Sequence, residues 1–340
     1  MKILLHMGQG KTGTTSLQQA LHRAANRLRA RGILYPDFGR KSVAHHLLLP
    51  LCERPDRLPP RSLVGLGGPE AAVEKAWQAW NATCDAALTR PPDVLLLSSE
   101  LLIHQTSAKA KVRLARSLAE LSTEVTPILY VRDPVAHYRA RLQEWLKSES
   151  APLPPTRLHL REAITDTEAA FAAAMQLVAF DRATLHGGDI TADFATRFLL
   201  PWITPADLPA PVANVGLSAE ALVLIARLRA RGGNTTEAAR SAARLIRPLM
   251  ALDRSDPPDR ALTLLPEVEE AALRAATCHR WLVETGRLVL PGLDPDRIDG
   301  SPVPDWLRTA PPETLFSHDA GRLDHLLHAL SLSDPALLKP

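Results

Sequence analysis

The sequence has few cysteines and no long apolar run. Its three cysteines, Cys52, Cys84 and Cys278, are widely spaced and match no metal-binding pattern, so we expect reduced thiols and no metal site. No segment approaches the roughly 18 consecutive apolar residues that a membrane helix requires. The apolar stretch at the N-terminus is also shorter than the core of a signal peptide. These absences predict a cytoplasmic protein without an integral membrane segment.

The sequence also lacks an excess of either charge. Lysine and arginine outnumber aspartate and glutamate by 40 − 37 = 3, which is too few to indicate a nucleic-acid partner. The isoelectric point near 8.9 still allows local basic patches that attract an anionic nucleotide. With 340 residues, of which 46% are hydrophobic, the chain can bury a large core. This composition is typical of an ordinary soluble enzyme.

Short apolar runs alternate with amphipathic helical patterns in the first half of the chain. The runs at 3–5, 94–97 and 125–131 suit strands of a parallel sheet that is covered on both faces. Apolar residues at helical spacing follow each run. This alternation predicts an α/β fold, with a parallel sheet of the phosphate-loop type flanked by helices and with ligands at the carboxyl ends of the strands.

The second half of the sequence is mostly helical in pattern. We expect a short strand at 177–180, with helices at 160–177, 218–231, 236–252, 266–285 and about 320–331. Ser218 is expected to cap the N-terminus of the helix at 218–231. We assign residues 1–200 to an α/β core and residues 201–340 to a helical part that completes the same domain, with a loosely packed tail after residue 291.

A glycine- and hydroxyl-rich loop at residues 6–16 reads His-Met-Gly-Gln-Gly-Lys-Thr-Gly-Thr-Thr-Ser and lies between the first strand and a helix. At a helix N-terminus, unpaired backbone N–H groups and the helix dipole favour an anion, and glycines let it approach the backbone closely. Lys11 adds a full positive charge. A simple helix cap is the alternative, but a cap requires one hydroxyl and no lysine. The loop therefore predicts a phosphate site.

The same loop matches the end of the nucleoside-triphosphate pattern, in which a glycine and four further residues precede Gly-Lys-Ser/Thr. Gly10, Lys11 and Thr12 supply that end, but Leu5, five residues before Gly10, lies inside the strand. The loop is therefore too short to wrap a triphosphate, and we expect one phosphate with a neighbouring anionic group. The predicted ligands are Gly10, Lys11, Thr12, Gly13, Thr14, Thr15 and Ser16.

A second segment, residues 127–134, reads Pro-Ile-Leu-Tyr-Val-Arg-Asp-Pro and predicts a buried strand that ends in Arg132. With these two segments the chain resembles the sulfotransferases that use 3′-phosphoadenosine 5′-phosphosulfate (PAPS), in particular their bacterial members. The resemblance covers the first half of the chain well and the second half faintly. It implies that the loop binds the 5′-phosphosulfate and that Arg132 binds the 3′-phosphate, a task that suits the two parallel donors of a guanidinium.

The chain departs from the family at two places. A serine that also holds the 3′-phosphate usually follows the arginine by eight residues, and Ala140 stands there instead. Arg139 or Arg141 is expected to replace it; alternatively, nucleotide affinity is weaker or the helix register differs by one residue. The downstream Arg-Lys-Gly element of the animal and plant enzymes is also absent.

The resemblance implies sulfuryl transfer from PAPS to a hydroxyl or amine of a small-molecule, carbohydrate or lipid acceptor, without a metal. Lys11 is placed to stabilise the oxygen that bridges sulfur to the leaving phosphate. Two candidates could take the acceptor proton: Glu100, directly after the second strand, and the pair His45 and His46. His6 is expected to pack beneath the loop.

Two other functions stay open at this point. A small-molecule kinase could use Gly10 to Thr12 with ATP and Mg²⁺, and Glu100 or Asp133 could then hold the metal. A non-catalytic nucleotide-binding protein of the same fold is the third possibility, which the departure at Ala140 supports. Loops at 36–68 and 150–160 are expected to determine which acceptor binds.

Overall fold

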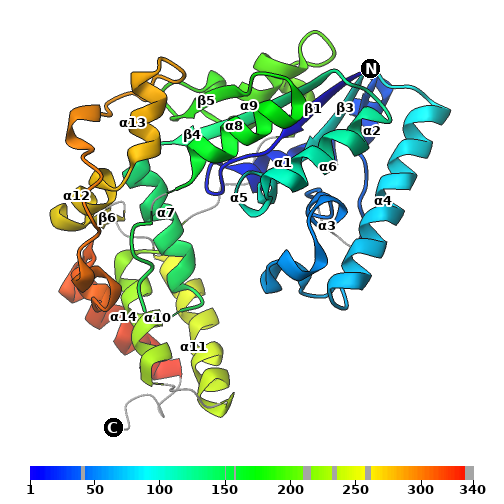
Figure 1. The fold of residues 1–340 in the computed structure, drawn as a ribbon. Helices are drawn as coiled ribbons and strands as arrows, with labels where there is room; N and C mark the ends of the chain where they lie inside the picture. Colours follow the sequence, from blue (N-terminus) through cyan, green and yellow to red (C-terminus); the bar gives the residue numbers. More distant parts are fainter. Residues whose placement is uncertain are drawn as a thin grey trace. The chain divides into compact units, whose positions relative to one another are not determined.

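The chain folds into two units in a computed structural model (Figure 1), which describes residues 1–39, 43–149, 151–156, 158–209, 216–231, 236–256 and 262–333. The first unit comprises Met1–Asp133, Leu158–Val212 and Cys278–Leu293. The second comprises Pro134–Arg157, Ala213–Thr277 and Asp294–Pro340. Segments of the two units therefore alternate along the sequence.

The first unit is built on a parallel sheet of five strands. In spatial order these are β2(Ile33–Leu34), β3(Val94–Ser98), β1(Lys2–His6), β4(Val125–Arg132) and β5(Gln176–Phe180). Every neighbouring pair in this sheet is parallel. The continuous apolar runs of β1, β3 and β4 are buried in it, as expected for strands that are covered on both faces. The predicted α/β fold is confirmed.

Helices cover both faces of this sheet. They are α1(Thr14–Arg23), α2(Ala25–Ala30), α3(Leu48–Cys52), α4(Pro69–Thr89), α5(Leu101–Gln105), α6(Ala108–Ala119), α8(Leu160–Phe171), α9(Ile190–Phe194) and α13(Thr277–Glu284). Side chains of a strand alternate between the faces: Ile3 and Leu5 join a core with Trp80 of α4, while Leu4 joins a core with Leu21 of α1. The central strand β1 is thereby fixed from both sides.

The register of the sheet places the end of β4 beside the loop that follows β1. His6, the last residue of β1, pairs with Ser98 on one side and with Ile128 on the other. β4 continues from Ile128 to Arg132, which is four residues or about 13 Å of extended chain. Arg132 therefore extends well past the end of β1, alongside the predicted phosphate loop.

The second unit is mostly helical. Its helices are α7(Pro134–Leu146), α10(Ala219–Arg231), α11(Thr236–Ser255), α12(Pro266–Arg274) and α14(Ala320–Ser333), with a small antiparallel pair of β6(Thr263–Leu264) and β7(Phe316–Ser317). The segment 266–285, expected as one helix, is two helices, α12 and α13. After residue 291, Leu307, Leu315 and Leu326 are fully buried in the core of this unit.

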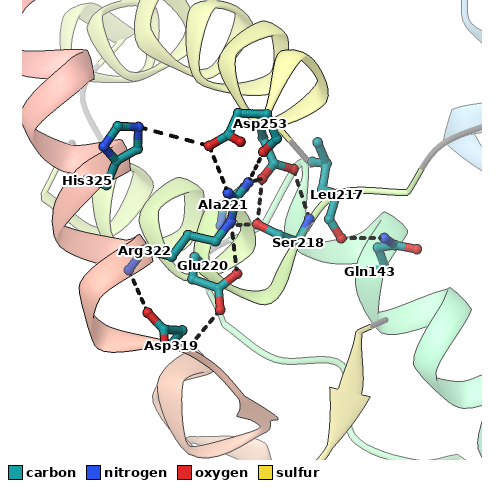
Figure 2. Close-up of polar contacts among 10 residues, drawn as sticks. Gln143, Leu217, Ser218, Glu220, Ala221, Asp253, Asp319, Arg322 and His325 are labelled. Carbon is teal, nitrogen blue, oxygen red and sulfur yellow. Dashed lines mark hydrogen bonds and ion pairs between the residues drawn. The ribbon is translucent and has the colours of Figure 1, made fainter. Parts of the chain in front are cut away.

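An ionic cluster joins the ends of three helices in the second unit (Figure 2). Arg322 on α14 donates to Asp253 on α11 at 2.9 Å and lies 3.7 Å from Glu220 on α10. Ser218 donates its hydroxyl to Asp253 at 2.6 Å and accepts the backbone N–H of Ala221 at 3.0 Å. Ser218 is therefore the N-cap of α10, as predicted.

Short turns of 3-10 or π-helix complete the two units. They are η1(Pro55–Arg57), η2(Pro60–Leu63), η3(His186–Gly188), η4(Ala195–Leu199), η5(Pro205–Asp207), η6(Pro295–Arg297), η7(Asp305–Arg308) and η8(Pro312–Thr314). Among the described residues, no helix is both long and apolar enough to cross a membrane.

Candidate functional site

The loop between β1 and α1 has a left-handed backbone at three positions. These are Gly8 at φ 36°, Lys11 at φ 71° and Gly13 at φ 75°. A Cβ on Gly8 would lie 2.6 Å from Thr14 Cγ2, so no larger residue fits there without a shift. Lys11 carries a side chain in this conformation, which costs of order 1–3 kcal/mol and is a feature found mainly at functional sites.

The hydroxyl groups of the loop differ in their access to solvent. Thr12 is fully buried, and its hydroxyl donates to the backbone oxygen of Gln9 at 2.5 Å. Thr14 is buried too, whereas Thr15 is exposed and Ser16 is partly exposed. The Thr12 side chain therefore braces the loop, and Thr15 and Ser16 present the hydroxyls that a ligand can reach.

Gly13 is the N-cap of α1, which begins at Thr14. A Cβ on Gly13 would lie 3.0 Å from Ile190 Cγ2, so the helix start packs closely against α9, whereas a Cβ on Gly10 would meet nothing within 4 Å. The side of Gly10 on which a Cβ would stand therefore faces open space. The loop thus has the form expected of an anion site, with an accessible backbone turn directly before a helix N-terminus.

Arg132 makes four contacts, two of which are with this loop. Its backbone N–H donates to Gln9 Oε1 at 2.9 Å, and its backbone oxygen lies 3.1 Å from His279 Nε2. Its Nη1 donates to the backbone oxygen of Lys11 at 3.0 Å, and its guanidinium lies 5.6 Å from the centre of the Phe180 ring. The guanidinium at the end of β4 is therefore fixed beside Lys11, as a two-part anion site requires.

The structure distinguishes between the two adjacent histidines. His45 is 1% exposed; its Nδ1 accepts the backbone N–H of Ser98 and its Nε2 lies 2.8 Å from the oxygen of Pro36. Burial lowers the pKa of His45 to about 4, against the opposing effect of the bond to Pro36. Because both ring nitrogens are occupied, His45 fixes the end of β3 and is not available as a base.

His46 and Glu100 lie together at the end of β3. The distance from His46 Nε2 to Glu100 Oε1 is 3.6 Å, and His46 Nδ1 lies 3.0 Å from Ser99 Oγ. The two side chains are 39% and 22% exposed, so a substrate can reach both. A Cβ on Gly8 would lie 3.4 Å from Glu100 Cβ, which places Glu100 next to the predicted phosphate loop. Glu100 and His46, proposed as alternatives, are therefore neighbours in one site.

His6 is buried beneath the loop, as expected. Its Nδ1 lies 2.8 Å from Ser98 Oγ, and its ring packs edge-on against Tyr130 and Phe194. Burial lowers the pKa of His6 to about 4, although the charge of Glu100 acts in the opposite direction. His6 is therefore neutral near pH 7 and contributes packing and a hydrogen bond to the floor of the site.

Arg141 and Ala140 lie on α7, in the second unit. Arg141 donates from Nη1 to Thr156 Oγ1 at 3.2 Å, and burial lowers its pKa. The role of Arg141 as a nucleotide ligand stays a prediction.

Three residues of the site have no part in the sequence-based prediction. They are Gln9, which holds the backbone of Arg132, Gln18, which donates to Glu100 Oε2 at 2.9 Å, and His279. Gln9 lies within the loop motif and Gln18 lies two residues after it. Their polar side chains at these positions could have indicated, from the sequence alone, that they belong to the site. His279 lies 147 residues from its partner along the chain, and nothing in its local sequence indicates the contact.

Comparison with protein-family models, with curated proteins and with solved structures gives no match.

Proposed function

We propose that the protein is a PAPS-dependent sulfotransferase. One observation carries this proposal: three groups suited to the reaction lie at the carboxyl ends of three neighbouring parallel strands. The phosphate loop follows β1, Glu100 follows β3 and Arg132 ends β4, with Arg132 bonded to Lys11. The sequence resemblance supplies the assignment, and this arrangement supports it because open α/β sheets bind ligands at that edge.

The residues present fit a nucleotide with two separate anionic ends. Lys11, the hydroxyls of Thr15 and Ser16 and the start of α1 would hold the 5′-phosphosulfate, since they offer positive charge and donors. Arg132 would hold the 3′-phosphate, and the bond of its Nη1 to the Lys11 oxygen and its position over the Phe180 ring keep the guanidinium in place before a ligand binds. Glu100, the carboxylate that follows β3, is suited to a proton acceptor rather than to an anion ligand.

When bound, PAPS supplies an activated sulfuryl group. Glu100 would take the proton of the acceptor hydroxyl or amine, a contribution of about 10²–10⁴-fold to the rate. Lys11 would stabilise the negative charge that develops on the bridging oxygen. The acceptor is a small molecule, carbohydrate or lipid with such a group, and the protein acts in the cytoplasm.

Selective stabilisation by nucleotides tests this proposal. We expect 3′-phosphoadenosine 5′-phosphate (PAP) to raise the Tm of the wild-type protein, because a ligand at a hundredfold excess over its Kd adds about 2.7 kcal/mol to the stability. ATP with Mg²⁺ and adenosine 5′-phosphosulfate, which lack the 3′-phosphate, are expected to raise it less. If ATP with Mg²⁺ raises the Tm and PAP does not, phosphoryl transfer would be favoured instead. If PAP binds but PAPS is not cleaved, a non-catalytic protein would be favoured.

A further inference from the structure

The Glu100 carboxylate is approached from two sides by two different kinds of side chain. Gln18 of α1 donates from Nε2 to Glu100 Oε2 at 2.9 Å, and Gln18 is only 2% exposed. His46 lies on the other side, with Nε2 at 3.6 Å from Oε1 and with 39% of its side chain exposed. Oε2 is therefore bonded to a buried donor, whereas Oε1 faces the more exposed His46.

The amide of Gln18 is itself fixed in orientation. Its Nε2 also donates to Ser98 Oγ at 3.2 Å, and Ser98 Oγ lies 2.8 Å from His6 Nδ1. A primary amide has two N–H groups, so both bonds from Nε2 can form together. A continuous set of hydrogen bonds thus connects β1, β3 and α1 to one oxygen of Glu100. A network of this kind holds its members more firmly than a single bond does.

We propose that Gln18 is a positioning residue for Glu100, and that Oε1 is the oxygen that receives the acceptor proton; this inference rests on the proposed sulfotransferase function. The hydrogen bond that Gln18 donates to Oε2 favours negative charge on this oxygen and so disfavours a proton there. In the step, a lone pair of the acceptor oxygen forms the new bond to sulfur. The bond from sulfur to the 5′-phosphate oxygen breaks with its electron pair left on that oxygen, and the acceptor proton passes to Glu100 Oε1.

A comparison of Gln18→Met with Gln19→Met tests this role. Methionine is similar to glutamine in length but donates no hydrogen bond, and Gln19 is the partly exposed neighbour of Gln18 on α1. The assay is the cleavage of PAPS with water as the acceptor, with PAP binding measured in parallel. A hydrogen bond to a charged group contributes about 1.5–3 kcal/mol, so we expect kcat to fall about 10- to 100-fold in Gln18→Met. The KM for PAPS and the Kd for PAP should stay within about twofold, and Gln19→Met should behave as the wild type.

The outcomes separate the inference from the function on which it rests. If the wild type cleaves PAPS and Gln18→Met retains its kcat, the inference is wrong and the sulfotransferase proposal stands. If the folded wild type neither binds PAP nor cleaves PAPS, the proposed function fails and the inference fails with it. If Gln18→Met does not fold, Gln18→Asn tests the same contact, because the shorter side chain withdraws the amide from Glu100. Full kcat in Gln18→Asn would overturn the inference, and a fall with unchanged KM would support it.

Discussion

Glu100→Gln is expected to slow the cleavage of PAPS by about 10²–10⁴-fold, the usual contribution of a general base. The substitution keeps the size of the side chain and removes its ability to accept a proton at neutral pH. Glu100 is 22% exposed and lies next to Gly8 of the predicted phosphate loop, and glutamine fills the same space, so the site should keep its shape. We therefore expect the Kd for PAP and the thermal stability to change little.

Steady-state cleavage of PAPS, with water as the acceptor, measures this effect. Glu124→Gln is the matched control, because the exposed Glu124 lies at the opposite edge of the same sheet, where its backbone oxygen accepts the N–H of Ile3. Glu124→Gln should retain the wild-type rate. A rate for Glu100→Gln within threefold of the wild type would exclude Glu100 as the base, and His46, its neighbour at 3.6 Å, would then be the remaining candidate.

Arg322→Met is expected to destabilise the protein by about 3–5 kcal/mol, the typical cost of leaving buried charges without their partner. The side chains of Asp253 and Glu220 are 1% and 7% exposed, and Arg322 is 14% exposed between them. Arg322 also donates from Nη1 to Asp256 at 3.1 Å and from Nη2 to the backbone oxygen of Asp256. Burial lowers the pKa of Arg322, but the bonds and charges of Asp253 and Asp256 raise it above its ordinary value.

Urea unfolding of the full chain, followed by circular dichroism, measures this loss. Arg227→Met serves as the control, since Arg227 is in the same unit and pairs with Glu313 at 3.1 Å, with 45% and 30% of the two side chains exposed. An exposed pair of this kind contributes about 0–1 kcal/mol. Equal destabilisation by the two substitutions would show that the cluster around Arg322 has no special role in holding α10, α11 and α14 together.

The sheet could be predicted from the sequence because its strands are short, continuous apolar runs with a helical pattern after each. The loop and Arg132 could also be predicted, since each motif is local and each lies at the end of one of these runs. The contact between the loop and Arg132 could not be predicted, because it depends on how far β4 continues past Ile128, the partner of the last residue of β1. The register of β4 against β1 is set by pairing between the strands and not by either segment alone.

The roles of His45 and His46 could not be separated from the sequence, because the two residues are adjacent and have the same chemistry. The distinction comes from the docking of this segment on β3, where His45 bonds through its backbone N–H to the oxygen of Ser98 and through its ring to the N–H of Ser98. This docking turns His45 inward and leaves His46 beside Glu100. The role of Gln18 could not be predicted from the sequence either. Helical periodicity places Gln18 near the buried face of α1, but only the fold shows that it contacts Glu100.

The most direct test of the nucleotide site is the preference of the protein for PAP over AMP, measured by isothermal titration calorimetry on the wild type, Arg132→Ala and Arg161→Ala. Arg161 is the matched control, because it lies over the Trp281 ring at 5.6 Å, as Arg132 lies over Phe180. If Arg132 binds the 3′-phosphate, the wild type and Arg161→Ala should prefer PAP by about 10- to 100-fold, as expected for charged hydrogen bonds, and Arg132→Ala should lose this preference. An equal preference for PAP in all three proteins would show that Arg132 does not bind the 3′-phosphate.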